Sequence, residues 1–246
     1  MLYRTSHDKA RFGRLEKGGA VQHRTYTYKI AYIGSQGERG REWCTVTVHR
    51  NGHRTIRAVC EMDDSQVLRD VTYTVDERWH PLDAFVRVSV MDRFMGSAWF
   101  RFDGRNVECE AYTAAEGRLS QRLAFEEAPH SFVTHPVACD VWHFANIDRA
   151  KPNEIQTSLS ASCSPLPNGA SGPMLGISRH RFRYLGRQET PAPAGTYETE
   201  HVEFVGQDGV ARLKAWCTTT DRILVRMEFE PLKSVYQLVE LSGSAG

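Results

Sequence analysis

The chain has 246 residues, of which 41% are hydrophobic and 25% charged, and its 31 Lys and Arg side chains face 30 Asp and Glu, a net charge of +1. This composition excludes a disordered chain, and the length suits one all-β domain. The balanced charge provides no field that would attract nucleic acid or anionic lipid, and no segment approaches the roughly 20 apolar residues of a membrane helix. We therefore expect neither nucleic acid nor a membrane as a partner.

The first 20 residues are polar, with five Lys or Arg side chains and no apolar run. A secretory signal peptide needs an apolar stretch, so we expect residues 1–20 to be a polar N-terminal segment of a cytoplasmic protein. The six cysteines lie far apart, without any Cys-x-x-Cys pair. In a reducing compartment they are interpreted as small buried hydrophobes, not as disulfides or zinc ligands.

Alternating residues predict short strands through the first half of the chain. At 23–33 the apolar residues occupy one phase and the polar ones the other, the period-2 pattern of a half-buried strand. Asn51 and Gly52 form the strongest hairpin signal. Further strands are predicted at 43–49, 54–62, 71–76, 84–91, 97–103, 106–112 and 118–126.

Two segments interrupt this rhythm before the second series of strands. Residues 136–147 predict a helix of about three turns that begins near Pro136. Residues 165–173 are rich in Pro, Gly and Ser and predict a loop, either a lid over a ligand or a neutral insertion. Strands are then predicted at 157–163, 176–185, 195–205, 210–217, 222–230 and 235–241.

Taken together, these elements predict an all-β fold. We expect a strongly curved antiparallel sheet or open barrel of about a dozen strands with one short helix. Residues 21–242 would form this single domain, and 243–246 a flexible tail. A homodimer through unpaired sheet edges is left open.

Strand-and-turn motifs carry a resemblance to a known kind of protein. The stretches 79–88 and 96–100, and again 194–196 and 216–225, resemble uncharacterised bacterial proteins of the lipocalin-like or lipoprotein-carrier-like open-barrel kind. The resemblance implies a curved sheet wrapped around a hydrophobic ligand. It implies no catalytic residue.

The familiar catalytic fingerprints are missing from the sequence. It contains no Gly-x-Gly-x-x-Gly, no Walker loop, no Gly-x-Ser-x-Gly and no His-Glu-x-x-His. We therefore expect no cofactor. The aromatic content of five Trp, nine Tyr and eleven Phe would suit flat apolar walls around a small hydrophobic or aromatic molecule, although the same residues would also fill an ordinary core.

The densest group of titratable residues brackets the predicted helix: His135, Asp140 and His143, with His130 before them. Asp140 and His143 are three residues apart, so on a helix the carboxylate could orient the imidazole for proton transfer. The same residue types could bind a divalent metal, or could be structural or surface histidines. We take His135, Asp140 and His143 as candidate catalytic residues and predict no metal site.

A second candidate pair is His201 and Glu203, which lie two apart on a predicted strand and so project to one side. If that side faces a cavity, Glu203 could remove an activated proton while His201 holds the substrate. If it faces water, both are ordinary surface residues.

The remaining candidates are ligand-binding residues. Arginines and a tyrosine would hold a polar end, tryptophans the apolar body, and a histidine in a turn would line the rim. These residues are Arg87, Arg101, Tyr73, Trp99, Trp142, Trp216 and His80. The sequence thus favours a small-molecule-binding barrel, either a cofactor-independent lyase or isomerase using acid/base chemistry, or a non-catalytic carrier or sensor of apolar ligands.

Overall fold

The computed structural model describes residues 23–166 and 168–243. The predicted N-terminal segment 1–20 and residues 244–246 of the predicted tail lie outside the described residues. Within the described part, eight strands of the first half are β1 (Arg24–Gly34), β2 (Gly37–Val48), β3 (Arg54–Met62), β4 (Val67–Val75), β5 (Pro81–Val90), β6 (Arg93–Asp103), β7 (Asn106–Thr113) and β8 (Gly117–Ala124).

The second half adds seven more strands and the helical segments. The strands are β9 (Ser131–Val133), β10 (Ile155–Ser162), β11 (Gly176–Ala192), β12 (Gly195–Val205), β13 (Ala211–Thr218), β14 (Leu224–Phe229) and β15 (Ser234–Ser242). The helix α1 (Val137–Asp140) continues directly into the 3-10 helix η1 (Val141–Asn146), and a second 3-10 turn is η2 (Glu230–Leu232).

All fifteen strands form one sheet in the order β8-β7-β6-β5-β4-β3-β2-β1-β15-β14-β13-β12-β11-β10-β9. Two meanders are therefore joined where the first strand pairs with the last, between β1 and β15. The pair β9 and β10 is parallel, whereas the other neighbouring strands run antiparallel. The end strands β8 and β9 do not pair with each other within the described residues, so the sheet is curved but not closed. This confirms the predicted fold class, with fifteen strands in place of about a dozen.

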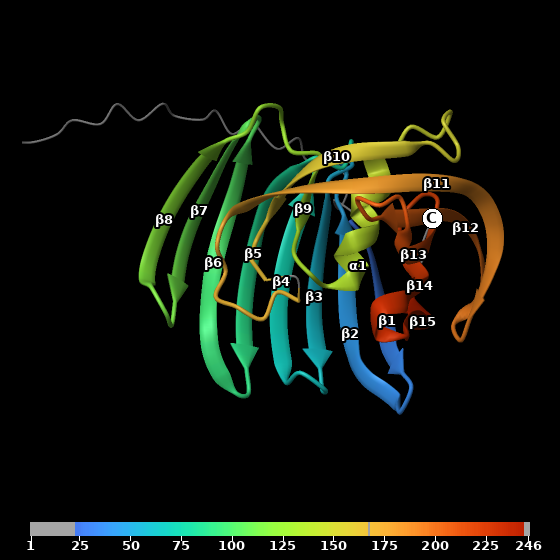
Figure 1. Ribbon diagram of the computed structural model, residues 1–246, viewed down its shortest axis with the longest axis horizontal. Coiled ribbons are helices and arrows are strands. Elements are labelled where there is room, and N and C mark those ends of the chain that lie inside the picture. The colour runs from blue at the N-terminus through green and yellow to red at the C-terminus, as the bar shows by residue number, and fades with distance from the viewer. Residues whose placement is uncertain (1–22, 167, 244–246) are drawn as a thin grey trace, which may run out of the picture.

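The helical segment lies inside the curve of the sheet (Figure 1). Its predicted span, 136–147, is confirmed, although only four residues are α-helical and the rest form the tighter 3-10 turn. Trp142 and Phe144 of η1 are almost fully buried against the inner face of the sheet. The apolar phase of each strand faces this side, so the hydrophobic core fills the hollow of the curved sheet.

Curvature comes from irregular points in the strand pairing. The register shifts between Lys29 and Ile30 against β15, and again at Gly186 in the 17-residue strand β11. Such bulges bend a strand and increase its twist. They allow one continuous sheet to fold back over its own inner face, which creates the space described next.

Candidate functional site

A cavity of about 840 Å³ lies on the inner face of the sheet, bounded by α1, by the loop between β10 and β11, and by the C-terminal strands. Most of its wall is apolar, with side chains that include Val133, Leu175, Phe204, Leu213, Met227 and Phe229. Pro165, Leu166 and Asn168 of the predicted loop also line it. The loop thus forms part of the cavity wall.

One cross-strand row of the inner face reaches the lining of the cavity at Arg69. Glu42 of β2 pairs in register with Cys60 of β3, which pairs with Arg69 of β4. Each occupies the phase that its strand otherwise gives to apolar residues, and each is at most 1% exposed. A buried glutamate and a buried arginine on one apolar face require specific partners.

Glu42 links the sheet to the start of the helix. Its carboxylate accepts hydrogen bonds from the Val137 amide at 2.6 Å, from the Ala138 amide at 3.0 Å and from the Tyr32 hydroxyl. The first amides of a helix have no partner within the helix, so the carboxylate satisfies two of them. Burial nevertheless raises the pKa of Glu42 to about 7, against the opposing effect of these hydrogen bonds and of Arg69.

Arg69 lines the cavity and is held by the loop. One terminal nitrogen, Nη2, donates to the Asn168 carbonyl at 2.9 Å, and Nη1 lies 3.9 Å from the Cys60 sulfur. Gly169 follows with a φ of +64°, and a Cβ there would lie 2.5 Å from the His135 ring and 2.6 Å from Nη2 of Arg69. Only glycine permits this close approach of the loop backbone.

Three histidines face the same space: His135, His143 and His180. Burial lowers the pKa of His135 to about 3, with a further contribution from the Arg69 cation, and lowers that of His180 to about 4. Burial also holds the pKa of His143 well below its usual range. At neutral pH all three rings are therefore uncharged. His135 has a φ of +74°, which is uncommon for a residue other than glycine and typical of functional sites.

Asp140, the last residue of α1, is the acidic group of the cavity. Burial raises its pKa to about 8, helped by the Glu42 carboxylate and opposed by Arg69, so it is mainly protonated at neutral pH. Its Oδ1 lies 3.8 Å from Nε2 of His143, while Nδ1 of that ring is hydrogen-bonded to the Ser131 hydroxyl at 2.5 Å. The helical spacing of three residues does bring Asp140 and His143 together, as the sequence predicts.

Of the predicted site residues, His135, Asp140 and His143 line the cavity. Tyr73 and Trp142 are buried in the core, with ring centroids 5.4 Å apart, and do not line it. His80 lies in a turn, where its Nδ1 is 3.2 Å from Asp76, and its side chain is 44% exposed.

The other predicted residues are placed differently from what a cavity role requires. Arg87, Trp99 and Arg101 project from the outer face of the sheet, because the inner phase of β5 and β6 belongs to residues such as Val86 and Phe100. Arg87 lies 3.8 Å from Asp70, and Trp99 is 42% exposed.

The outer face also carries His201, Glu203 and Trp216, because Val202 and Phe204 take the inner phase of β12. His201 stacks on Trp216 with ring centroids 4.3 Å apart, and Arg183 donates to Glu203 at 3.1 Å. These contacts correct the alternative in which His201 and Glu203 face the cavity. They stabilise the pairing of β11, β12 and β13 on the opposite side of the sheet.

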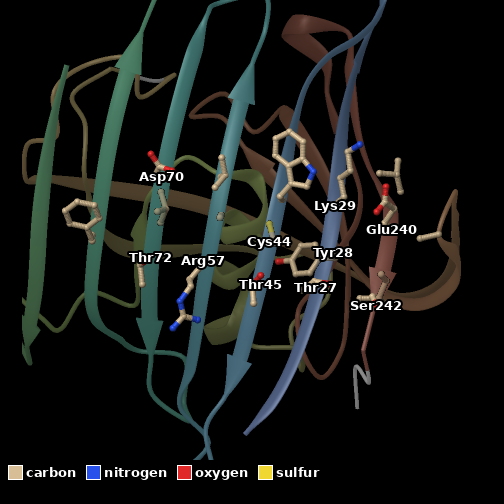
Figure 2. Close-up of a pocket in the computed structure, with 18 residues that line it drawn as sticks. Thr27, Tyr28, Lys29, Cys44, Thr45, Arg57, Asp70, Thr72, Glu240 and Ser242 are labelled. Carbon is tan, nitrogen blue, oxygen red and sulfur yellow. The ribbon is translucent and has the colours of Figure 1, made fainter. Parts of the chain in front are cut away.

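A second hollow, of about 860 Å³, lies on the outer face across β15, β1, β2, β3 and β4 (Figure 2). Its charged side chains are Lys29, Arg57, Asp70 and Glu240, all at least partly exposed. The buried titratable groups of this hollow are Tyr28 and Cys44, whose pKa values burial raises so far that both stay protonated at neutral pH. The inner cavity instead brings together a carboxyl group and three imidazole rings with displaced pKa values, which is the signature of a functional site. The inner cavity is therefore the candidate functional site.

Sequence reasoning missed Arg69, Glu42 and His180. The signal was present in the strand phase: Arg69 alternates in step with Val67, Val71 and Tyr73, so a charged residue occupies an apolar position. His180 lies in β11 beside Arg179 and Arg181, and no motif or spacing in that stretch of sequence singles it out.

The described residues contain no group of three or more His, Cys, Asp or Glu side chains placed to hold a metal ion. In the same part of the chain, no helix has the length and apolar character to cross a membrane.

Comparison with known proteins identifies the fold but not the function. No family model and no curated protein matches the chain. Its structure is similar to that of a β-barrel-like protein from Brucella abortus, a domain of unknown function (DUF1849), with a TM-score of 0.56 and 12% identity over 92% of this chain and 100% of the other. A DUF1089 family protein from Pseudomonas aeruginosa matches with a TM-score of 0.42 and 12% identity, over 78% of this chain and 90% of the other.

The class of protein is thus an open β-barrel-like fold shared with a bacterial protein of unknown function. At 12% identity the first of these likenesses shows the fold alone.

Proposed function

We propose that the protein binds one amphipathic small molecule in the inner cavity, with an apolar body along the walls and a polar end at the floor. The supporting observation is the combination of apolar walls with buried, convergent polar groups in about 840 Å³. Small-molecule sites commonly have volumes of roughly 300–1,000 Å³ and this distribution of apolar and polar surface. The proposal retains the hydrophobic ligand that the lipocalin-like resemblance implies.

The test is fluorescence titration with N-phenyl-1-naphthylamine, a neutral apolar probe whose emission rises on leaving water. Leu213 lines the cavity, and Leu213→Trp would fill part of it. Leu68 lies on the outer face, 38% exposed, so Leu68→Trp is the matched control. We expect the probe to bind saturably to wild type. Leu213→Trp should lower the affinity for the probe at least about tenfold, and Leu68→Trp should leave it unchanged. Equal binding by all three proteins would place the probe elsewhere and refute the proposal.

A second function, acid/base catalysis of the lyase or isomerase kind, is favoured by Asp140. A general acid or base works best when its pKa lies near the working pH, and burial brings that of Asp140 to about 8. Asp140 retains 21% exposure of its side chain. In this alternative Asp140 transfers the proton and His143 positions it, the reverse of the roles that the sequence suggests.

Isotope exchange separates the two functions. Organic molecules extracted from the purified protein are returned to it in heavy water, and their deuterium content is followed by mass spectrometry. An enzyme that removes a carbon-bound proton would incorporate deuterium, Asp140→Asn would abolish this, and Asp70→Asn on the outer face would leave it unchanged. The absence of protein-dependent incorporation would refute the catalytic alternative and leave binding in place.

A further inference from the structure

Arg69 is a buried cation without a counter-ion among the described residues. It is 1% exposed, and no Asp or Glu carboxylate of the described chain forms an ion pair or hydrogen bond with its guanidinium. Its Nε is buried and has no hydrogen-bond partner. Leaving such a group unpaired costs several kcal/mol, so a partner from outside the chain would be strongly favoured at this point.

A second unpartnered nitrogen lies beside it. Nε2 of His135 is also buried without a hydrogen-bond partner, and this residue lines the cavity together with Arg69. The backbone of Gly169 packs against both side chains at once, which places the ring and the guanidinium next to each other. Two neighbouring side chains at the floor of an apolar cavity therefore each have a buried nitrogen atom without a hydrogen-bond partner.

The inner cavity has little net positive charge at its floor. Arg39 and Arg212 also line the cavity, but the first lies 2.7 Å from Asp64 and the second 2.5 Å from Asp208. The three histidines are uncharged at neutral pH, as described above. The cavity thus offers one uncompensated positive charge, that of Arg69.

The two carboxyl groups nearest Arg69 leave its charge largely uncompensated. Asp140 lines the cavity and is mainly protonated at neutral pH because burial raises its pKa to about 8. Glu42 already accepts three hydrogen bonds, and β3 separates it from Arg69 by two strand spacings, about 10 Å. One negative charge on a ligand would balance Arg69, whereas a second negative charge would be buried in the cavity without a cation to pair with.

We propose that the ligand is a long-chain carboxylic acid whose carboxylate pairs with Arg69 and accepts a hydrogen bond from Nε2 of His135, an inference that rests on the proposed binding function. The carboxylate matches the fork of a guanidinium in charge and geometry. The Asn168 carbonyl accepts a hydrogen bond from Nη2 of Arg69 and so fixes the guanidinium, while Nε stays without a partner. The apolar walls accept the hydrocarbon chain.

The experiment measures displacement of N-phenyl-1-naphthylamine at pH 7 by three ligands of equal chain length: dodecanoic acid, dodecanol and dodecyl phosphate. We expect the acid to bind at least about tenfold more tightly than the alcohol and more tightly than the phosphate. In Arg69→Met the acid should lose this advantage while the alcohol binds as before. Arg101→Met, on the outer face, is the matched control and should behave as wild type.

The outcomes distinguish this inference from the binding function itself. If acid and alcohol displace the probe equally from the wild-type protein, or neither displaces it, the cavity binds apolar molecules but the carboxylate assignment is wrong. Tighter binding of dodecyl phosphate would also overturn it. A probe that binds Leu213→Trp as well as wild type would refute the binding function. The wild-type ligand series decides the question even if Arg69→Met does not fold.

Discussion

Replacement of Glu42 by Gln tests whether this buried carboxyl group controls stability near neutral pH. Burial raises its pKa from the ordinary 4.5 to about 7. Below pH 4.5 the group is protonated in both the folded and the unfolded chain, and its contribution to stability is fully present. As the pH rises through this interval the unfolded chain ionises while the fold keeps the proton, so the free energy of unfolding falls, and it levels off above pH 7.

The size of the loss of stability follows from the shift in the pKa of Glu42. A rise in pKa from 4.5 to about 7 corresponds to about 3 kcal/mol of stability lost between those pH values. Gln does not titrate, so the variant should lack this loss. It accepts hydrogen bonds through one oxygen where the carboxyl uses two, for Val137 and Ala138, which adds a fixed cost of about 1 kcal/mol that does not depend on pH.

The assay is urea unfolding followed by tryptophan fluorescence at several pH values from 5 to 8. As the pH rises from 4.5 to 7, the free energy of unfolding of Glu42→Gln should increase by about 3 kcal/mol relative to that of wild type. Asp140 and the histidines titrate in both proteins, so their contributions largely cancel in this difference. A difference between the two proteins that stays constant over this range would refute the assignment of a raised pKa to Glu42.

Three further predictions concern stability. Burial lowers the pKa of His180 from 6.5 to about 4, so the free energy of unfolding falls as the pH drops through this interval. Between pH 7 and pH 4, His180→Asn should therefore lose about 3 kcal/mol less of its free energy of unfolding than wild type. Equal losses in the two proteins would contradict this. Phe132 is fully buried between aromatic rings, so Phe132→Ala should cost about 3–5 kcal/mol in urea unfolding, and a cost below about 1 kcal/mol would show that the core is placed wrongly. Glu200 pairs with Arg149 at 2.7 Å and Arg222 at 3.2 Å; Glu200→Gln should lower stability by about 3 kcal/mol in the same assay, and an unchanged unfolding midpoint would refute the ion-pair network.

The sequence predicts the fold well because strand alternation and turn residues are local signals. The ends of individual strands are less predictable. β2 begins at Gly37, six residues before the expected start, because its first residues are mostly charged or glycine, a composition typical of loops. The three-residue strand β9 is too short for any periodicity to show. The pairing of β1 with β15 joins residues more than 200 positions apart, which no local pattern encodes.

The candidate site is predictable only in part. Asp140 and His143 were found because helical spacing puts them on one face. Arg69 comes from a distant strand, and its role depends on the loop that folds over it, so only the structure brings it to His135. Residues such as Trp99 were misplaced because a strand has two faces, and an exposed aromatic residue has the same local sequence signature as one that lines a cavity.

A crystal structure of the protein grown with saturating dodecanoic acid would test most directly whether the inner cavity binds a carboxylic acid through Arg69. We expect one molecule in the inner cavity, with its carboxylate within hydrogen-bond distance of Nε of Arg69 and its chain between Leu213 and Met227. Ligand density in the outer hollow of Figure 2, or an inner cavity that stays free of ligand, would contradict it.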